Sequence, residues 1–175
     1  MNFKRLVPLA FPALLIFAPS CLKDDPAETY ADWRVQNEDY ITEAESSGNF
    51  TKITPVWDKT SFVLMKWLRH GESPNKIKPL DNSTVEVVYL LTNIKGDTLD
   101  SSYRLNADSI FRVQPSSTCT GFRVALTNMN IGDSVEAIMP YFAGYGSTGY
   151  GSVLPYSSLI FQIKLVGIPA LEKKP

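Results

Sequence analysis

The stretch Tyr141–Phe161, "YFAGYGSTGYGSVLPYSSLIF", combines four glycines with four tyrosines and then runs into an apolar strand. Glycine adopts positive φ angles without steric cost, so we expect this loop to bend sharply several times. Tyrosine has an apolar body and a polar tip, which suits contact with a partly apolar ligand. The alternative is a hairpin loop whose rings pack back on their own sheet. The rest of the chain has to distinguish these two interpretations.

The composition excludes several classes of function. A length of 175 residues leaves room for one domain with extensions. The 17 Lys and Arg residues balance 18 Asp and Glu residues without a basic cluster, so no nucleic-acid partner is expected. The longest apolar run, Leu6–Phe17, is shorter than the roughly 20 residues that a membrane-spanning helix needs.

The first 20 residues have the order of a secretory signal peptide: basic residues, an apolar run and then small residues. Cys21 follows directly and resembles the lipidation site of bacterial lipoproteins, with residues 21–27 as a polar tether. Within the tether, Lys23–Asp25 resembles the export tag of some Gram-negative surface lipoproteins. We therefore expect an exported protein held at the outer membrane or cell surface by this lipid anchor alone. A plain secreted protein is the alternative.

Cys119 is the second cysteine of the chain, and His70 is the single histidine. With Cys21 lipidated, Cys119 has no disulfide partner, and we expect it to be a buried small hydrophobic residue. Nothing in the sequence places a base next to this thiol, as a nucleophilic cysteine would require. We expect neither nucleophilic catalysis nor a metal site, and no cofactor.

The mature chain divides into a helical extension and a sheet. Residues 28–47 carry Tyr30, Trp33, Tyr40 and Ile41 at loosely helical spacing, so we predict an amphipathic helix. We assign residues 28–60 to this N-terminal extension and read residues 49–60 as irregular. Whether the helix docks on the domain or mediates dimerisation is open. Residues 61–170 are assigned to the main domain.

Strands and one short helix alternate in that domain. We expect strands at residues 61–68, 84–93, 98–105, 109–113, 134–140 and 158–168, each rich in β-branched or aromatic residues or alternating in polarity. Between the fourth and fifth strands, an apolar stripe at helical spacing predicts a short helix; the stripe comprises Phe122, Ala125, Leu126 and Met129. This order predicts an α+β fold in which an antiparallel β-sheet wraps over one short α-helix.

Three segments give the chain a resemblance to the FKBP family of peptidyl-prolyl cis-trans isomerases, from about residue 84 to residue 168. "VEVVYLLTNIKGDTLDSS" resembles the opening strands of the family, and "TGFRVALTNMNIGDSVEAIMP" resembles its helix and the following strand. "AGYGSTGYGSVLPYSSLIFQIKLVGI" is similar to the closing signature, with a tyrosine-glycine pair, a variable loop, a proline and an apolar strand. All three occur in the family's order and spacing.

The resemblance implies a pocket for a proline ring. Tyr145 matches the tyrosine whose hydroxyl donates to the bound peptide's carbonyl, and Asp100 matches the pocket aspartate; these two would be the catalytic residues. The backbone amide of Cys119 would bind a ligand carbonyl. The remaining implied substrate-binding residues are Tyr89, Leu99, Phe111, Phe122, Val153 and Phe161. Proline-containing polypeptides would be the substrates, and macrolide FKBP ligands would bind in the same pocket.

The pocket departs from the family pattern at several positions. Leu99 replaces a phenylalanine, Ser109 replaces the first ring of a phenylalanine-x-phenylalanine pair, and Thr118-Cys119 replaces a larger apolar pair. The expected function is isomerisation of X-Pro bonds in exported proteins as a folding assistant. Two alternatives stay open: a weakly active or inactive FKBP-like chaperone or binding module of the cell envelope, and a surface protein that binds glycans through its tyrosine loop.

Overall fold

The computed structural model describes residues 25–72, 76–104 and 108–169. The expected signal peptide and the expected lipidation site at Cys21 therefore lie outside the described residues, as does most of the expected tether. The helices are α1 (Pro26–Thr29), α2 (Ala31–Ser46) and α3 (Thr120–Asn128), and three short 3-10 turns accompany them: η1 (Ser102–Arg104), η2 (Pro115–Ser117) and η3 (Tyr141–Ala143). The strands are β1 (Thr51–Ile53), β2 (Val63–Arg69), β3 (Val85–Thr92), β4 (Thr98–Ser101), β5 (Phe111–Val113), β6 (Ser134–Met139) and β7 (Leu159–Gly167).

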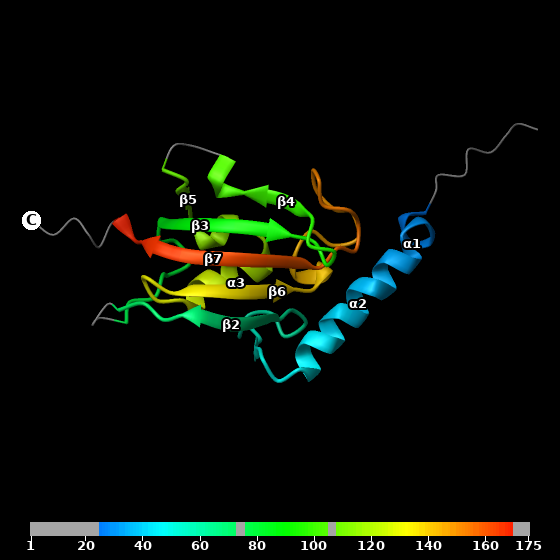
Figure 1. Ribbon diagram of the computed structural model, residues 1–175, viewed down its shortest axis with the longest axis horizontal. Helices are drawn as coiled ribbons and strands as arrows, with labels where there is room; N and C mark the ends of the chain where they lie inside the picture. Colours follow the sequence, from blue (N-terminus) through cyan, green and yellow to red (C-terminus); the bar gives the residue numbers. More distant parts are fainter. Residues whose placement is uncertain (1–24, 73–75, 105–107, 170–175) are drawn as a thin grey trace, which may run out of the picture.

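The strands form one antiparallel sheet with the order β1-β2-β6-β7-β3-β4, and β5 also pairs with β3 (Figure 1). The alternation read from the sequence is confirmed in its two central strands. In β3, Val85, Val87, Tyr89 and Leu91 are buried, while the intervening residues are partly exposed. Side chains of β7 alternate between buried and more exposed in the same way. Period-two burial places one apolar face of each strand on the core.

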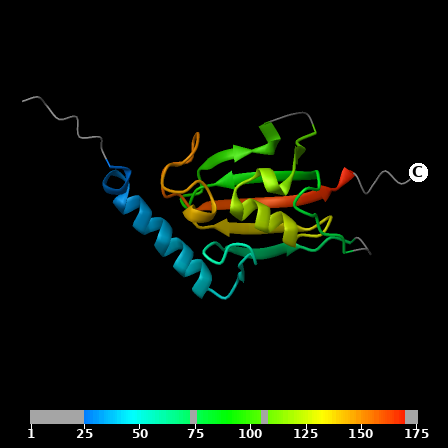
Figure 2. The same cartoon turned by 180° about the vertical axis from the view of Figure 1, so that it is seen from behind.

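Helix α3 covers one face of the sheet, as the apolar stripe predicts (Figure 2). All four stripe residues, Phe122 to Met129, are buried in the main core. The helix approaches β6 closely at Gly121, where an added Cβ would lie 2.6 Å from the sulfur of Met139. This close approach brings the N-terminal turn of α3 near the middle of the sheet, where the pocket described below is formed.

The N-terminal helix docks on the domain. Ile41 of α2 packs with Leu64 and Ile138 in a second apolar cluster, which resolves the question whether the helix contacts the domain. The irregular segment expected at residues 49–60 contains β1, which pairs with β2 and so joins the extension to the sheet. Such a three-residue strand carries too little periodicity to be recognised in sequence. Among the described residues, no helix combines the length and apolar character needed to cross a bilayer.

Candidate active site

A pocket of about 340 Å³ opens between the core face of the sheet, the N-terminus of α3 and the loop after η3. Its side chains come from five separate parts of the chain, which the sheet and α3 bring together. The lining consists of Tyr89, Leu91, Asp100, Phe111, Val113, Ser117, Thr118, Cys119, Phe122, Tyr145, Tyr150 and Phe161.

Four aromatic rings form the inner wall. Tyr89 of β3 lies 5.6 Å from Phe111, 6.0 Å from Phe122 and 5.9 Å from Phe161, measured between ring centroids. The Phe122 and Phe161 rings are 4.8 Å apart. These are the separations and tilted orientations that aromatic pairs prefer, so the rings hold one another in place. The result is an apolar cavity whose shape is fixed by packing.

Asp100 is exposed at the edge of the pocket and is held by two hydrogen bonds. The Tyr89 hydroxyl donates to Oδ2 over 2.7 Å, and the Ser101 amide donates to Oδ1 over 2.7 Å. Burial and this bond to Asp100 together raise the pKa of Tyr89, so the phenol stays protonated and remains a donor.

A β-bulge explains how Asp100 reaches this position. Leu91 pairs with Asp100, but the next residue, Thr92, pairs with Thr98, so Leu99 is an extra residue in β4. Bulges bend a strand and redirect its side chains, often next to active sites. Here the bulge lets Leu99 and Asp100 contribute to neighbouring cavities, although they are adjacent in sequence.

Tyr145 closes the pocket from the loop side. Its ring stacks on that of Tyr150, with centroids 5.3 Å apart and planes 23° apart. Burial, together with the nearby Cys119 and Asp100, raises the pKa of Tyr145, so its hydroxyl stays protonated. Within the described part of the chain, no hydrogen bond to this hydroxyl is found, which leaves the Tyr145 O–H available to a ligand.

Cys119 lies at the N-terminal end of α3. The sequence suggested that it is buried, but the structure shows it only partly buried. Burial raises the pKa of its thiol, which disfavours a reactive thiolate. Its backbone N–H makes no backbone hydrogen bond in the part of the chain that the structure describes. An unpaired amide at a helix N-terminus is a suitable donor to a carbonyl oxygen.

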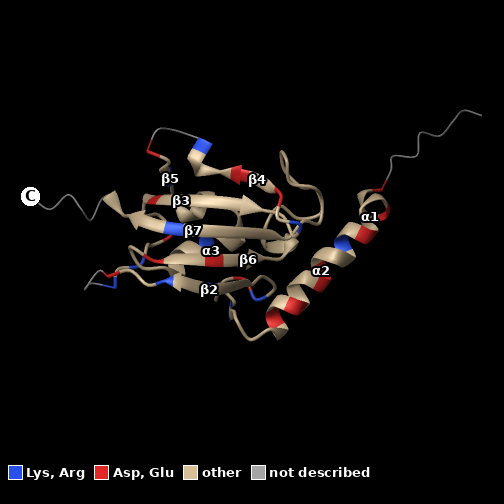
Figure 3. Ribbon diagram, in the orientation of Figure 1, with Lys and Arg blue, Asp and Glu red and all other residues tan. Residues whose placement is uncertain are grey.

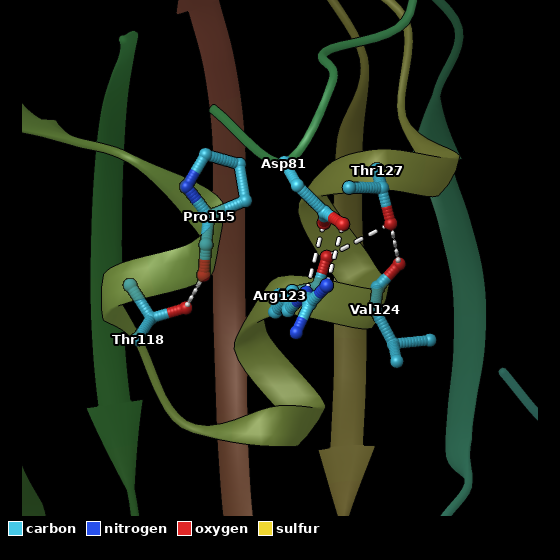
Figure 4. Close-up of polar contacts among 6 residues, drawn as sticks. All are labelled: Asp81, Pro115, Thr118, Arg123, Val124 and Thr127. Carbon is cyan, nitrogen blue, oxygen red and sulfur yellow. Dashed lines mark hydrogen bonds and ion pairs between the residues drawn. The ribbon is translucent and has the colours of Figure 1, made fainter. Parts of the chain in front are cut away.

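Polar contacts fix this end of α3 (Figure 4). The Thr118 hydroxyl donates to the carbonyl of Pro115 over 2.7 Å, which closes the turn before the helix. Arg123 donates from both Nε and Nη2 to the carboxylate of Asp81, in a bidentate ion pair. These contacts hold the turn before α3 and the first turn of the helix, the segment that carries Cys119 and Phe122.

A smaller cavity of about 230 Å³ adjoins the first. It shares Leu91, Asp100, Tyr145 and Tyr150 with the main pocket, and it is also lined by Leu99 and Val153. Leu99 is a smaller side chain than the phenylalanine that the family pattern has here. Leu99 and Val153 thus lie beside the main pocket and not in it.

The structure brings seven of the nine expected pocket residues into one cavity and the other two into its neighbour. Four lining residues were missed, namely Leu91, Val113, Ser117 and Tyr150, and Thr118 had been noted only as a departure from the family pattern. Leu91 and Val113 could have been found, because each is two positions from an expected residue on the same strand face. Tyr150 carries no such signal, because its position depends on the path of an irregular loop.

Comparisons with known proteins agree with this geometry. The model of the FKBP-type peptidyl-prolyl cis-trans isomerase family matches residues 75–166. FK506-binding protein 2 from Aspergillus oryzae is 34% identical over 97 residues, which cover 55% of this chain and 72% of that protein. The FKBP-type isomerase FkpA from Escherichia coli K12 is 30% identical over 100 residues, which span 55% of this chain but 36% of FkpA.

Solved structures share the fold. A peptidyl-prolyl isomerase from Pseudomonas syringae superposes with a TM-score of 0.65 at 25% identity, covering 82% of this chain and 96% of that one. E. coli FkpA superposes with a TM-score of 0.68 at 21% identity, covering 81% of this chain and 62% of that one. The chain therefore belongs to the family of FKBP-type peptidyl-prolyl cis-trans isomerases, the enzymes that rotate the peptide bond before proline.

Proposed function

We propose that this protein isomerises X-Pro bonds of exported polypeptides and that Tyr145 and Asp100 are its catalytic residues. The main support is the convergence of Tyr89, Phe122 and Phe161 around a cavity with Asp100 and Tyr145 at its edge. In this proposal the aromatic walls accept a pyrrolidine ring, and Asp100 and Tyr145 interact with the flanking peptide carbonyls.

The reaction needs no nucleophile. Rotation about a peptide bond meets a barrier of ~18–20 kcal/mol, because amide resonance is lost in the twisted state. For X-Pro bonds the uncatalysed cis-trans isomerisation takes roughly tens to hundreds of seconds, which is slow enough to limit folding. Water stabilises the planar, charge-separated amide more than the twisted one. An apolar pocket therefore favours the twisted state, and each ~1.4 kcal/mol of preference increases the rate tenfold.

Each polar group then has a separate role. Tyr145 donates its hydroxyl to a peptide carbonyl, and the backbone amide of Cys119 binds a second carbonyl of the extended substrate. Asp100 orients the carbonyl dipole of the bond that rotates, and Tyr89 positions Asp100 through their 2.7 Å hydrogen bond. Phe122 forms the floor beneath the proline ring. Macrolide FKBP ligands would compete for the same cavity.

A peptide assay tests this proposal. We expect the purified protein to accelerate isomerisation of short X-Pro peptides, measured by protease-coupled or NMR exchange assays. Asp100→Val should lower kcat/KM by about tenfold or more, because the substitution removes the charge that faces the amide. A macrolide FKBP ligand should inhibit the wild type competitively.

The alternatives give different results. A wild-type protein that binds a proline peptide without accelerating its isomerisation would be a binding module or chaperone. Binding to a glycan array without any peptide activity would support the sugar-binding surface protein. Either outcome would reject the proposed enzymatic role, whatever the variants do.

We also propose that the protein is exported and lipid-anchored through Cys21. The support is the order of basic, apolar and small residues before this cysteine. Metabolic labelling with a fatty-acid analogue should modify the wild type in a Gram-negative host and should leave Cys21→Ala unlabelled. A wild-type protein that is exported without label would instead be a plain secreted protein.

A further inference from the structure

The segment that carries Tyr145 is contacted by helix α2 at both ends of the segment. This segment, residues 141–158, leaves the sheet after β6 and returns to it at β7. Figure 1 shows α2 at the end of the sheet from which the loop projects. The β3–β4 turn adjoins the same helix, because Nζ of Lys95 lies 5.2 Å from the centroid of the Trp33 ring. Helix α2 thus contacts both the segment that carries Tyr145 and the turn that precedes Asp100 in β4.

Asn37 makes the strongest of these contacts. Its side chain is fully buried, which is unusual for an amide. Its Oδ1 accepts the backbone N–H of Ser158 over 2.6 Å, and its Nδ2 donates to the carbonyl of Trp33 over 2.7 Å. The Trp33 indole in turn donates to the hydroxyl of Ser157 over 2.9 Å. A buried amide of this kind fixes the backbone that it bonds, because an unpaired Ser158 N–H would be costly.

Arg34 holds the loop from the side. Arg34 is the single basic residue of α2, which otherwise carries acidic charges (Figure 3). Its guanidinium lies 5.7 Å from the ring centroid of Tyr141 and 5.3 Å from that of Tyr156, within cation–π range. These tyrosines flank the loop on opposite sides of Tyr145, and their rings are 5.3 Å apart.

Tyr156 also has a constrained backbone. Its φ angle is 60°, a left-handed conformation that non-glycine residues rarely adopt. Such residues persist only where the surrounding contacts hold them. Tyr156 is buried, and its N–H donates to the carbonyl of Gly146, next to Tyr145. Arg34 thus contacts Tyr156 directly, and Asn37 bonds Ser158, two residues further along the same segment.

We propose that α2 is part of the isomerase machinery, with Asn37 and Arg34 as positioning residues for the Tyr145 loop. The kinetic part of this proposal rests on the proposed isomerase function, whereas the positioning itself does not. Without these contacts the loop relaxes, Tyr156 leaves its left-handed conformation, and the Tyr145 hydroxyl is no longer held at the edge of the pocket.

Two substitutions in the same helix separate positioning from general stability. Asn37→Leu keeps the number and branching of the side-chain heavy atoms and removes the amide groups that bond Ser158 and Trp33. Ile41→Ala removes apolar packing against Leu64 and Ile138 and leaves the loop contacts intact. We expect Asn37→Leu to lower kcat/KM about five- to tenfold and Ile41→Ala to leave it within about twofold of the wild type. The comparison is made between variants whose free energies of unfolding, measured by urea denaturation, are similar. Trp33→Phe removes the indole donor to Ser157 and part of the ring that Lys95 contacts, but it leaves the Asn37–Ser158 bond. It should therefore give a smaller loss than Asn37→Leu.

Hydrogen exchange gives a readout that does not depend on activity. The N–H groups of Gly146 and Tyr156 are bonded within the loop, to the carbonyls of Tyr141 and Gly146. In Asn37→Leu these two amides should exchange at least tenfold faster, while amides of β7 keep their protection. The proposal would be overturned if Asn37→Leu and Trp33→Phe both had the exchange rates and the kcat/KM of the wild type. An equal loss of activity in Ile41→Ala would also overturn it. An inactive wild type would reject the isomerase function, but the exchange data would still decide whether α2 holds the loop.

Discussion

Tyr89 and Asp100 are joined by a 2.7 Å hydrogen bond from the phenol to Oδ2, whereas Tyr145 faces the same pocket without a partner among the described residues. The two tyrosines are therefore not equivalent. One uses its hydroxyl inside the protein to hold a carboxylate, and the other keeps its hydroxyl for a ligand. Each consequence can be tested by removing a single oxygen atom.

Tyr89→Phe keeps the aromatic wall but removes the bond to Asp100. We expect the free energy of unfolding to fall by about 1–2 kcal/mol, because a partly buried hydrogen bond to a carboxylate is lost. The value of kcat/KM should fall a few-fold, since Asp100 becomes free to rotate. Urea denaturation and the peptide assay measure these effects. Unchanged stability together with unchanged activity would show that the bond has no role.

Tyr145→Phe should reduce activity without affecting stability. The hydroxyl has no hydrogen-bond partner to lose among the described residues, so the melting temperature should stay within about one degree of the wild type. The kcat/KM should fall about three- to tenfold, as expected when one neutral hydrogen bond to the substrate is removed. Tyr150→Phe is the matched control, because it also removes a tyrosine hydroxyl, from the exposed ring that stacks on Tyr145. Equal losses in both variants would argue against Tyr145 as the specific donor.

Gly149→Ala should distort the loop. Gly149 has a φ of +69°, and an added Cβ would lie 2.3 Å from the carbonyl oxygen of Val153. Because that neighbour is backbone, the loop must shift, and we expect at least a fivefold loss of kcat/KM. Gly151→Ala has a similar φ of +56° with open space around the Cβ, so it controls for the backbone strain alone. A Gly149→Ala variant as active as Gly151→Ala would contradict this reading of the loop.

The protein should lose stability at alkaline pH through its pocket. Burial raises the pKa of the Cys119 thiol above its ordinary value of 9.0, so the unfolded chain releases this proton first. The unfolded state then binds fewer protons than the native state, and stability decreases as pH rises above about 9. Cys119→Ala should flatten the first part of this decline. Urea denaturation of the wild type and the variant between pH 7 and pH 11 measures how the free energy of unfolding depends on pH. If that dependence were the same in both proteins, the Cys119 thiol would make no contribution.

The sequence was sufficient for the elements that have clear periodicity. The buried faces of β3 and β7 and the apolar stripe of α3 follow from spacing alone, because each of these elements buries one side against the same core. The family motifs added the pocket residues, since they mark positions along those same elements. The short strand β1 was missed because three residues carry no periodicity.

Tertiary structure decided how those residues meet. No pattern in the sequence shows that an extra residue in β4 places Leu99 and Asp100 at adjoining cavities, because a bulge is a property of strand pairing. The same holds for Asn37, a polar residue in an acidic helix, whose partner Ser158 is 121 positions away. Local sequence determines which face of an element is apolar. Contacts between distant segments depend on how those faces pack, and only the folded chain determines that packing.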